Sequence, residues 1–331
     1  MSGHDATVDA SDPGALTPAA IEAAAERIPA ALRGSPQYIS EGLSASLGRP
    51  VVVKVESVNP IGAFKGRGAW LAVEAAAADG RATAEHPIVV ASTGNFGQAV
   101  AYAGRAQGIP VVVFADVAAN EHKLERIRLL GADLRVTGAD FDEAREASER
   151  FAAAGEGMLL IDGGDVWTAI GAGSLATEVT AAIDAGDIPA VEAAYVPVGN
   201  GALIAGTATW LKHAAPAIRT IGVQSDAAPA MTLSMEQGRA IETESAATRA
   251  GGIAIRVPVP EALVMMADVV DEMRLVSEAE MAAATAELVR ALGITAELSA
   301  GTTLAAARRY PSGSDGAVLL VITGSNAEPP L

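Results

Sequence analysis

The glycine-rich run Asn59-Pro60-Ile61-Gly62-Ala63-Phe64-Lys65-Gly66-Arg67-Gly68 lies between two apolar segments. Val51 to Val55, before it, predicts a strand, and Ala69 to Ala78, after it, predicts a buried helix. Lys65 is the only lysine of the chain in such a turn. Apolar surroundings favour a neutral amine, so this position suits a nucleophile or a Schiff base. The alternative interpretation is an ordinary lysine whose stem covers apolar surface.

Composition restricts the chemistry that the chain can support. With 331 residues, 50% hydrophobic and 4% aromatic, it can bury an aliphatic core large enough for one two-lobed unit or two domains. The net charge of −17 argues against nucleic acids and anionic membranes as partners, because both require basic protein surfaces. The chain has no cysteine, and its histidines lack metal-ligand spacing. We therefore expect neither disulfides nor thiolate catalysis, and no metal site.

The first residues give no targeting signal. Met1 to Gly14 is polar and contains three aspartates, unlike the basic and then apolar layout of a signal peptide. No uncharged apolar run reaches the length that spans a bilayer. We therefore expect a cytoplasmic protein without a membrane partner.

Short apolar runs alternate with helical segments along most of the chain. Continuous apolar strands such as Val111 to Phe114 favour burial on both faces. This pattern predicts an α/β fold of open parallel sheets with helices on both faces. Residues 1–16 are expected to form a flexible arm, Ala19 to Leu32 a helix, and Ile241 to Pro260 a long loop. The other expected elements are the strands Ile88–Ala91, Val111–Ala115, Leu134–Thr137, Met158–Ile161, Ala194–Val198, Ile218–Gln224 and Ala317–Ile322, and the helices Gly97–Gln107, Glu121–Leu130, Phe141–Ala154, Ser174–Ala185, Ala202–His213, Ala227–Gln237, Glu278–Leu292 and Thr302–Arg309.

Two further segments begin helices at the carboxyl ends of expected strands. Ser92-Thr93-Gly94-Asn95-Phe96-Gly97-Gln98 offers hydroxyls, an amide and backbone N–H groups, which together can bind an anion. Val198-Gly199-Asn200-Gly201-Ala202-Leu203 can direct its backbone amides at a phosphate. The alternatives are an ordinary capped helix for the first segment, and for the second a strand-to-helix turn whose glycines serve the chain path alone.

The second segment also allows a nucleotide-binding oxidoreductase. However, the third glycine of a Gly-x-Gly-x-x-Gly match would be Gly206, which comes two places late. The other candidate, Gly171-Ala172-Gly173, follows the nearest expected strand by about ten residues, which is too far for a Rossmann turn. Neither match favours a dinucleotide fold.

Two segments near the carboxyl end complete the candidate site. Val321-Ile322-Thr323-Gly324-Ser325-Asn326 ends the last expected strand, and Glu297-Leu298-Ser299-Ala300-Gly301 precedes it in the chain. Glu297 could be a helix-start carboxylate and nothing more.

These segments resemble, in the same order, the motifs of the fold-type II pyridoxal-phosphate (PLP) enzymes of the threonine/serine dehydratase family. There a Pro-x-Gly-Ser-Phe-Lys-x-Arg-Gly run carries the lysine that binds the cofactor. The resemblance implies a tryptophan synthase beta-like fold of two open parallel-sheet lobes, with PLP in the cleft. Residues 1–82 would form the first part of the large lobe, 83–164 a small mobile lobe, and 165–331 the second, PLP-binding part of the large lobe.

The resemblance also implies a role for each matching residue. Lys65 would form the Schiff base and remove the α-proton, and Thr93 would act as a second acid or base. The loop Ser92-Thr93-Gly94-Asn95 would bind the substrate carboxylate. The cofactor-binding residues would be Phe64, Lys65, Asn95, Gly199, Asn200, Gly201, Ala202, Leu203, Glu297 and Thr323.

The chain departs from the family pattern at several positions. Ala63 replaces a serine, Phe96 a histidine, and Gly251 an acidic residue. Gly222-Val223-Gln224-Ser225 lacks the acidic ligands that hold a cation in some relatives, so no metal is expected there. Thr323 would face the pyridine nitrogen with a neutral hydroxyl, which makes the ring a weaker electron sink than a carboxylate would and favours loss of a β-substituent.

The expected function is therefore β-elimination from a hydroxy amino acid of the threonine or serine type, giving a 2-oxo acid and ammonia. The cofactor phosphate would assist loss of the β-hydroxyl group. Within PLP chemistry the alternatives are β-replacement, a threonine synthase-like reaction and racemisation. Outside it they are a nucleotide-binding oxidoreductase and, because Ala63, Phe96 and Gly251 depart from the family pattern, a non-catalytic metabolite-binding protein. The resemblance suggests a homodimer whose small-molecule partner is an amino acid.

Overall fold

The computed structural model describes residues 8–313 and 315–327. The strands are β1 (Gln37–Ile39), β2 (Val51–Val55), β3 (Ile88–Ala91), β4 (Val111–Ala115), β5 (Asp133–Val136), β6 (Met158–Leu159), β7 (Val191–Pro197), β8 (Arg219–Ser225), β9 (Glu272–Val276) and β10 (Ala317–Ile322). The α-helices are α1 (Pro18–Ala25), α2 (Glu41–Leu47), α3 (Lys65–Ala78), α4 (Asn95–Gln107), α5 (Glu121–Leu129), α6 (Phe141–Ala153), α7 (Val166–Ala185), α8 (Ala202–Ala214), α9 (Ala230–Gln237), α10 (Pro260–Ala267), α11 (Glu278–Leu292) and α12 (Leu298–Arg309). Short 3-10 helices are η1 (Pro13–Ala15), η2 (Ala30–Leu32) and η3 (Gly251–Ile253).

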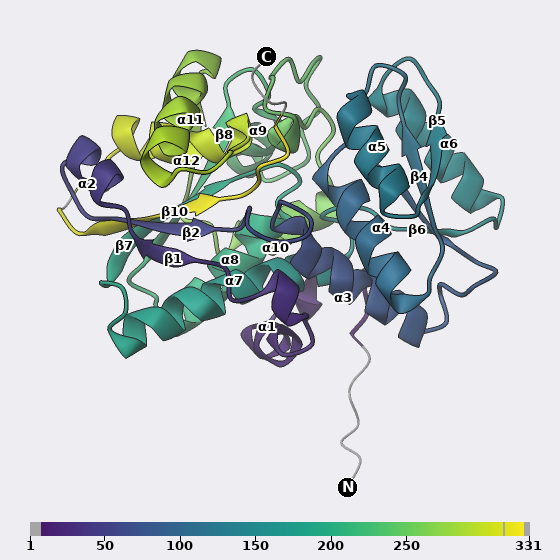
Figure 1. Cartoon of the computed structure of the whole chain (residues 1–331), viewed down its shortest axis with the longest axis horizontal. Coiled ribbons are helices and arrows are strands. Elements are labelled where there is room, and N and C mark those ends of the chain that lie inside the picture. Colours follow the sequence, from purple (N-terminus) through teal and green to yellow (C-terminus); the bar gives the residue numbers. More distant parts are fainter. Residues whose placement is uncertain (1–7, 314, 328–331) are drawn as a thin grey trace, which may run out of the picture.

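The larger sheet, as the described residues form it, has six strands in the order β1-β2-β10-β7-β8-β9. Only its edge strand β1 runs antiparallel to its neighbour. The strand β2 is buried along its whole length between β1 and β10. Helices cover both faces, with α7 and α8 on one side and α11 and α12 on the other (Figure 1). The expected α/β fold of parallel sheets is confirmed.

A second, four-stranded parallel sheet lies within residues 88–159, in the order β5-β4-β3-β6. The chain leaves the larger sheet after β2, builds this sheet with α4, α5 and α6, and returns through α7 (Figure 1). In parallel sheets the carboxyl ends of strands meet at one edge, which is where ligands bind. The loops after β2, β3, β6, β7 and β10 therefore converge between the two sheets.

Glycines allow α3, α7 and α8 to cross in close contact. A Cβ atom at Gly171 of α7 would lie 2.6 Å from the Cα atom of Gly68 in α3, and one at Gly206 of α8 would overlap the carbonyl oxygen of Ala169 in α7. Both glycine matches considered for a dinucleotide turn thus have a packing explanation. Among the described residues, α7 is the one helix long and apolar enough to span a membrane, yet 78% of its apolar window is buried inside the molecule, as in a core helix.

Some expected elements differ from those observed. The helix expected over Ala19 to Leu32 is wrong, because α1 ends at Ala25 and Pro29 precedes η2. The helix expected from Ser174 begins at Val166, with Asp165 as its N-cap residue. The elements α2, α10, β1 and β9 were not expected at all. A flexible arm was expected over residues 1–16, of which 1–7 lie outside the described residues. The described part of this segment instead packs against the core through Val8, Ala10, Ala15 and Leu16.

Candidate active site

One cavity of about 630 Å³ lies between the two sheets. It is lined by every residue that the sequence predicted for the site: Phe64, Lys65, Ser92, Thr93, Gly94, Asn95, Gly199, Asn200, Gly201, Ala202, Leu203, Glu297 and Thr323. The volume is within the usual range for small-molecule sites, roughly 300–1,000 Å³.

Lys65 is the first residue of α3 and extends into the cavity. The turn before it is fixed to the last strand, because the backbone N–H of Phe64 donates to the carbonyl oxygen of Thr323 at 3.1 Å. The Nζ atom of Lys65 lies 4.7 Å from the ring centroid of Phe64 and 5.8 Å from that of Phe96. Its side chain is 16% exposed. Aromatic rings thus border the lysine, but the amine is not in purely apolar surroundings, because a carboxylate also contacts it.

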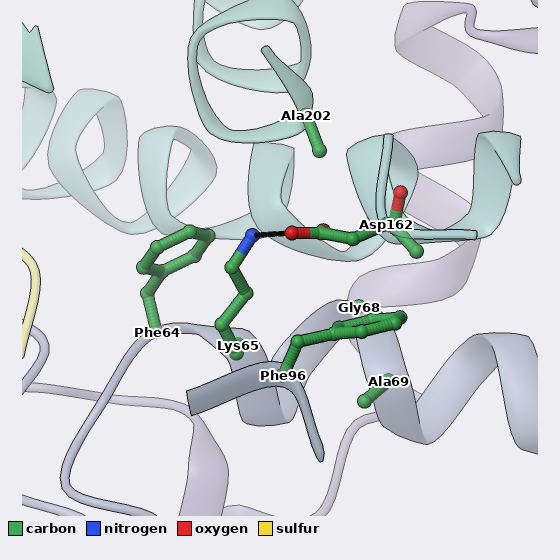
Figure 2. Close-up of a pocket in the computed structure, with 8 residues that line it drawn as sticks. Phe64, Lys65, Gly68, Ala69, Phe96, Asp162 and Ala202 are labelled. Atoms are coloured by element: carbon green, nitrogen blue, oxygen red, sulfur yellow. Dashed lines mark hydrogen bonds and ion pairs between the residues drawn. The ribbon is translucent and has the colours of Figure 1, made fainter. Parts of the chain in front are cut away.

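The sequence analysis did not identify the ion-pair partner of Lys65. Its Nζ atom lies 2.8 Å from Oδ1 and 2.7 Å from Oδ2 of Asp162, as Figure 2 shows. Asp162 comes directly after the expected strand Met158 to Ile161. The available signal was its place at the carboxyl end of a parallel strand, where functional side chains gather.

The turn from Gly199 to Leu203 connects β7 to α8. Gly201 has φ of +92°, which strains any residue with a Cβ atom. A Cβ atom at Gly199 would lie 2.6 Å from the carbonyl oxygen of Gly252. The first N–H groups of a helix have no partner within the helix, so the amides at the start of α8 are free to bind an anion there.

The segment from Ser92 to Asn95 connects β3 to α4. The Ser92 hydroxyl accepts hydrogen bonds from the backbone amides of Gly97 at 2.9 Å and Gly94 at 3.3 Å, which holds the turn in shape. Asn95, the first residue of α4, receives a 2.7 Å hydrogen bond on Oδ1 from the side-chain amide of Asn326. This network fixes the orientation of the Asn95 amide toward the cavity.

Glu297 does not cap the helix that it precedes, although that was one interpretation of its position. It is the N-cap residue of α12, but its side chain makes no capping hydrogen bond. Its Oε2 atom instead accepts from Asn95 at 2.8 Å, and its Oε1 atom lies 3.7 Å from Nζ of Lys123. Glu297 therefore connects the two sides of the cavity.

Thr323 follows β10 at the floor of the cavity. Its side-chain oxygen is buried and has no hydrogen-bond partner among the described residues. A buried hydroxyl without a partner costs roughly 1–3 kcal/mol, so the position favours a ligand that can bond to it.

A buried ionic network supports α3 behind the cavity. Arg67, two residues after Lys65, donates to Glu56 at 2.8 and 2.9 Å and to Glu178 at 2.7 and 3.1 Å, and Lys54 also binds Glu178. Burial acts to raise the pKa of Glu178, but the bonds and charge of Arg67, together with Lys54, outweigh it and lower that pKa to about 2. The network therefore holds Glu178 ionised and fixes Arg67 beneath the lysine.

The segment between α9 and α10, where a loop over the surface or the cleft was expected, lines the cavity. Arg256 from this loop pairs with Asp142 of α6 at 2.7 Å. Both residues line the cavity, so this ion pair links the segment to α6 at the cavity wall.

Comparison with known proteins gives concordant matches. Residues 28–324 match the family described as pyridoxal-phosphate dependent enzyme. The L-threonine ammonia-lyase of Geobacter sulfurreducens is 30% identical over 93% of this chain and 75% of its own, and that of Thermotoga maritima is 32% identical over 87% and 70%. The crystal structure of a threonine deaminase from T.th. superposes with a TM-score of 0.86 at 25% identity, covering 95% of this chain and all of that one (100%).

The cavity also fits the cofactor of that family. Lys65 supplies an amine, the Gly199–Leu203 turn supplies amides for a phosphate, and the unpartnered hydroxyl of Thr323 can bond to a ring nitrogen. The prediction of pyridoxal 5′-phosphate as the cofactor is confirmed. On the sequence match and on this geometry, the chain belongs to the family of pyridoxal-phosphate dependent enzymes.

Proposed function

We propose that this protein is an ammonia-lyase that removes the hydroxyl group from a β-hydroxy amino acid of the threonine or serine type and releases a 2-oxo acid and ammonia. The observation that carries the proposal is that Lys65, Thr323, the Ser92–Asn95 loop and the Gly199–Leu203 turn line one cavity. The names of the two relatives, both L-threonine ammonia-lyases, support this substrate class.

Each residue has a separate task in this reaction. Lys65 holds the cofactor before the substrate arrives and then takes the α-hydrogen as a proton on Nζ. The Ser92–Asn95 loop binds the substrate carboxylate through its hydroxyls and amide groups. The Gly199–Leu203 turn binds the cofactor phosphate, Glu297 orients Asn95 through their 2.8 Å hydrogen bond, and Thr93 is a candidate second acid or base.

Bound PLP would supply an electron-withdrawing ring that makes the α-hydrogen acidic. Thr323 would offer the ring nitrogen a neutral hydroxyl and no carboxylate. A ring that withdraws electrons less strongly favours loss of a group from the β-carbon over return of a proton to the substrate, which supports elimination over transamination. Phe64 and Phe96 flank Lys65 and exclude water from this side of the cavity (Figure 2).

We also propose a cytoplasmic homodimer whose small-molecule partner is the amino-acid substrate. The support is the resemblance to the dehydratase family and the acidic net charge of −17, which disfavours anionic surfaces. Sedimentation of the purified protein at several concentrations tests the dimer.

The decisive experiment is a screen of β-hydroxy and other β-substituted amino acids for release of a 2-oxo acid and ammonia. L-threonine and L-serine are expected to react. The Lys65→Ala variant should lose both turnover and the visible absorbance of the imine. Turnover in that variant would disprove the proposal.

The same screen separates the alternatives. Product that appears only with an added nucleophile would indicate β-replacement, and product from O-phosphohomoserine would indicate a threonine synthase-like enzyme. Inversion of the amino acid without a 2-oxo acid would indicate a racemase.

A further inference from the structure

Asp162 is the one side chain, in the part of the chain that the structure describes, that hydrogen-bonds to Nζ of Lys65. Both of its carboxylate oxygens lie within 2.8 Å of that atom, and its side chain is 17% exposed. The pair lies inside the cavity, with Phe64 and Phe96 near the lysine (Figure 2). A proton on Lys65 therefore has a direct hydrogen-bonded path to Asp162.

The other carboxylates on the cavity wall are committed elsewhere. Glu297 accepts from Asn95, and Asp142 pairs with Arg256. Glu149 accepts from Arg145 at 2.7 Å, and Asp140 accepts from the backbone amide of Glu143 at 3.0 Å as the N-cap residue of α6. Beyond Lys65, the described residues give Asp162 one weak contact, a 3.5 Å approach of the Asn200 side-chain amide. Lys65 is therefore the main hydrogen-bond partner of Asp162 among the described residues.

Asp162 also has a fixed position between the lysine and the phosphate turn. Gly163 has φ of +82°, and a Cβ atom there would lie 2.7 Å from the carbonyl oxygen of Asn200. Gly163 therefore packs directly on the turn, and the carboxylate next to it is anchored within reach of both Lys65 and Asn200. The Asp162 carboxylate thus contacts both the amine that would remove the α-proton and a residue of the Gly199–Leu203 turn.

Loss of a β-hydroxyl group requires a proton, because hydroxide is a poor leaving group. We propose that Asp162 is the general acid that protonates the departing β-hydroxyl group, using the proton that Lys65 removes from the α-carbon. This inference rests on the proposed elimination and assigns to a side chain the step that the family resemblance gave to the cofactor phosphate.

Atoms and electrons are conserved in the proposed proton transfer. The electron pair of the Cα–H bond becomes the second bond between Cα and Cβ, while Nζ of Lys65 takes the proton. The ammonium group passes a proton to the Asp162 carboxylate. The resulting carboxylic acid gives that proton to the β-oxygen, which leaves with the Cβ–O electron pair as water. Asp162 returns to its carboxylate form, and Lys65 to its neutral amine.

The test compares leaving groups that do and do not need a proton. Wild type, Asp162→Asn and Asp162→Glu are each loaded with PLP and assayed for 2-oxo acid from L-serine, L-threonine and β-chloro-L-alanine. General acids contribute roughly 10²–10⁴-fold, so Asp162→Asn should lower kcat for the two hydroxy substrates by about 100-fold or more. Its rate with β-chloro-L-alanine should stay within about threefold of wild type, because chloride leaves without a proton. Asp162→Glu should restore part of the lost rate.

Two controls keep the result interpretable. Imine absorbance, measured as PLP is added to each apo-protein, reports cofactor binding independently of turnover and should be retained in Asp162→Asn. Asp184→Asn, the same change on the exposed end of α7, should match wild type in every assay.

Three outcomes would overturn the inference. The first is an equal loss of rate for hydroxyl and chloride leaving groups. The second is a wild-type rate with L-serine in Asp162→Asn. The third is loss of the imine in both Asp162 variants, which would assign the residue to holding the cofactor. Failure of the wild type itself to release a 2-oxo acid from any of the substrates would instead disprove the proposed function.

Discussion

The side-chain amide of Asn95 donates a 2.8 Å hydrogen bond to Glu297, although the two residues are 202 positions apart in the chain. Asn95 begins α4 beside the four-stranded sheet, and Glu297 precedes α12 on the larger one. The bond therefore crosses the cavity and sets the orientation of the Asn95 amide.

Replacing Glu297 tests this bond. Glu297→Ala removes the acceptor, whereas Glu297→Gln retains an oxygen that can accept from Asn95. A hydrogen bond to a charged group contributes roughly 1.5–3 kcal/mol, so the alanine variant should lose about tenfold or more in kcat/KM. The glutamine variant should lose less. Initial rates over a range of L-threonine concentrations measure both, and equal losses would contradict the role of the bond.

Thr323→Val should separate folding from cofactor binding. Valine keeps the shape of the side chain and removes a buried hydroxyl that has no partner among the described residues. The apo-protein should therefore be as stable as wild type or more stable, while the affinity for PLP falls by about tenfold. Thr323→Ser, which keeps the hydroxyl, is the matched control. Thermal unfolding without PLP and titration with PLP give the two readings. A less stable apo-protein with unchanged PLP affinity would refute the assignment.

Gly201→Ala should distort the turn from Gly199 to Leu203. The residue has φ of +92°, and a Cβ atom would lie 2.6 Å from the sulfur of Met266. Strain of this kind costs roughly 1–3 kcal/mol, so both the free energy of unfolding and PLP affinity should fall. Gly42→Ala in α2, where a Cβ atom has only a 3.6 Å contact, should be tolerated or slightly stabilising. Urea unfolding compares the two variants, and an unaffected Gly201→Ala protein would contradict the prediction.

Glu178→Gln should destabilise the protein in a pH-dependent manner. The pKa of Glu178 is lowered from 4.5 to about 2 by Arg67 and Lys54, whose effects exceed the opposing effect of burial. Because the pKa is lower in the folded state, ionised Glu178 stabilises the fold, fully so above pH 4.5, and this stabilisation is lost as the pH falls through about 2. The difference between the two pKa values corresponds to about 3 kcal/mol of unfolding free energy.

The stability difference between wild type and Glu178→Gln should therefore shrink as the pH falls from 4.5 toward 2. Glu22→Gln, at an exposed position of α1, is the control and should show no such trend. Unfolding free energies measured across this pH range test the prediction. A difference that is constant with pH would show that the network contributes through packing alone.

The sequence was most informative where local signals coincide. The strands Val51–Val55 and Ala317–Ile322 and the helix Glu278–Leu292 were predicted with their observed bounds. The two strands are buried apolar runs, and the helix has a capping box at Ser277 and a left-handed glycine at Gly293. Most of the predicted site residues follow a strand whose carboxyl end faces the cleft, whereas Glu297 lies between α11 and α12.

Features that depend on tertiary contacts could not be predicted. The strand β9 is partly exposed, and its alternation of Glu272 and Arg274 with apolar residues is too short to mark a strand without its pairing to β8. The early start of α7 was missed because Gly171 and Gly173 disfavour a helix locally, although packing requires them. The pairing of Lys65 with Asp162 joins positions 97 residues apart, and no local pattern marks it.

The glycine contacts between α3, α7 and α8 also set the distance between Lys65 and the Gly199–Leu203 turn. Lys65 is the first residue of α3, and the Gly199–Leu203 turn ends at the first residues of α8. Because both helices are seated on α7 without intervening side chains, the span from the lysine to the turn is built into the core. Side chains on the cavity wall can therefore be exchanged, and the choice of amino acid altered, while the distance that the cofactor must bridge is unchanged.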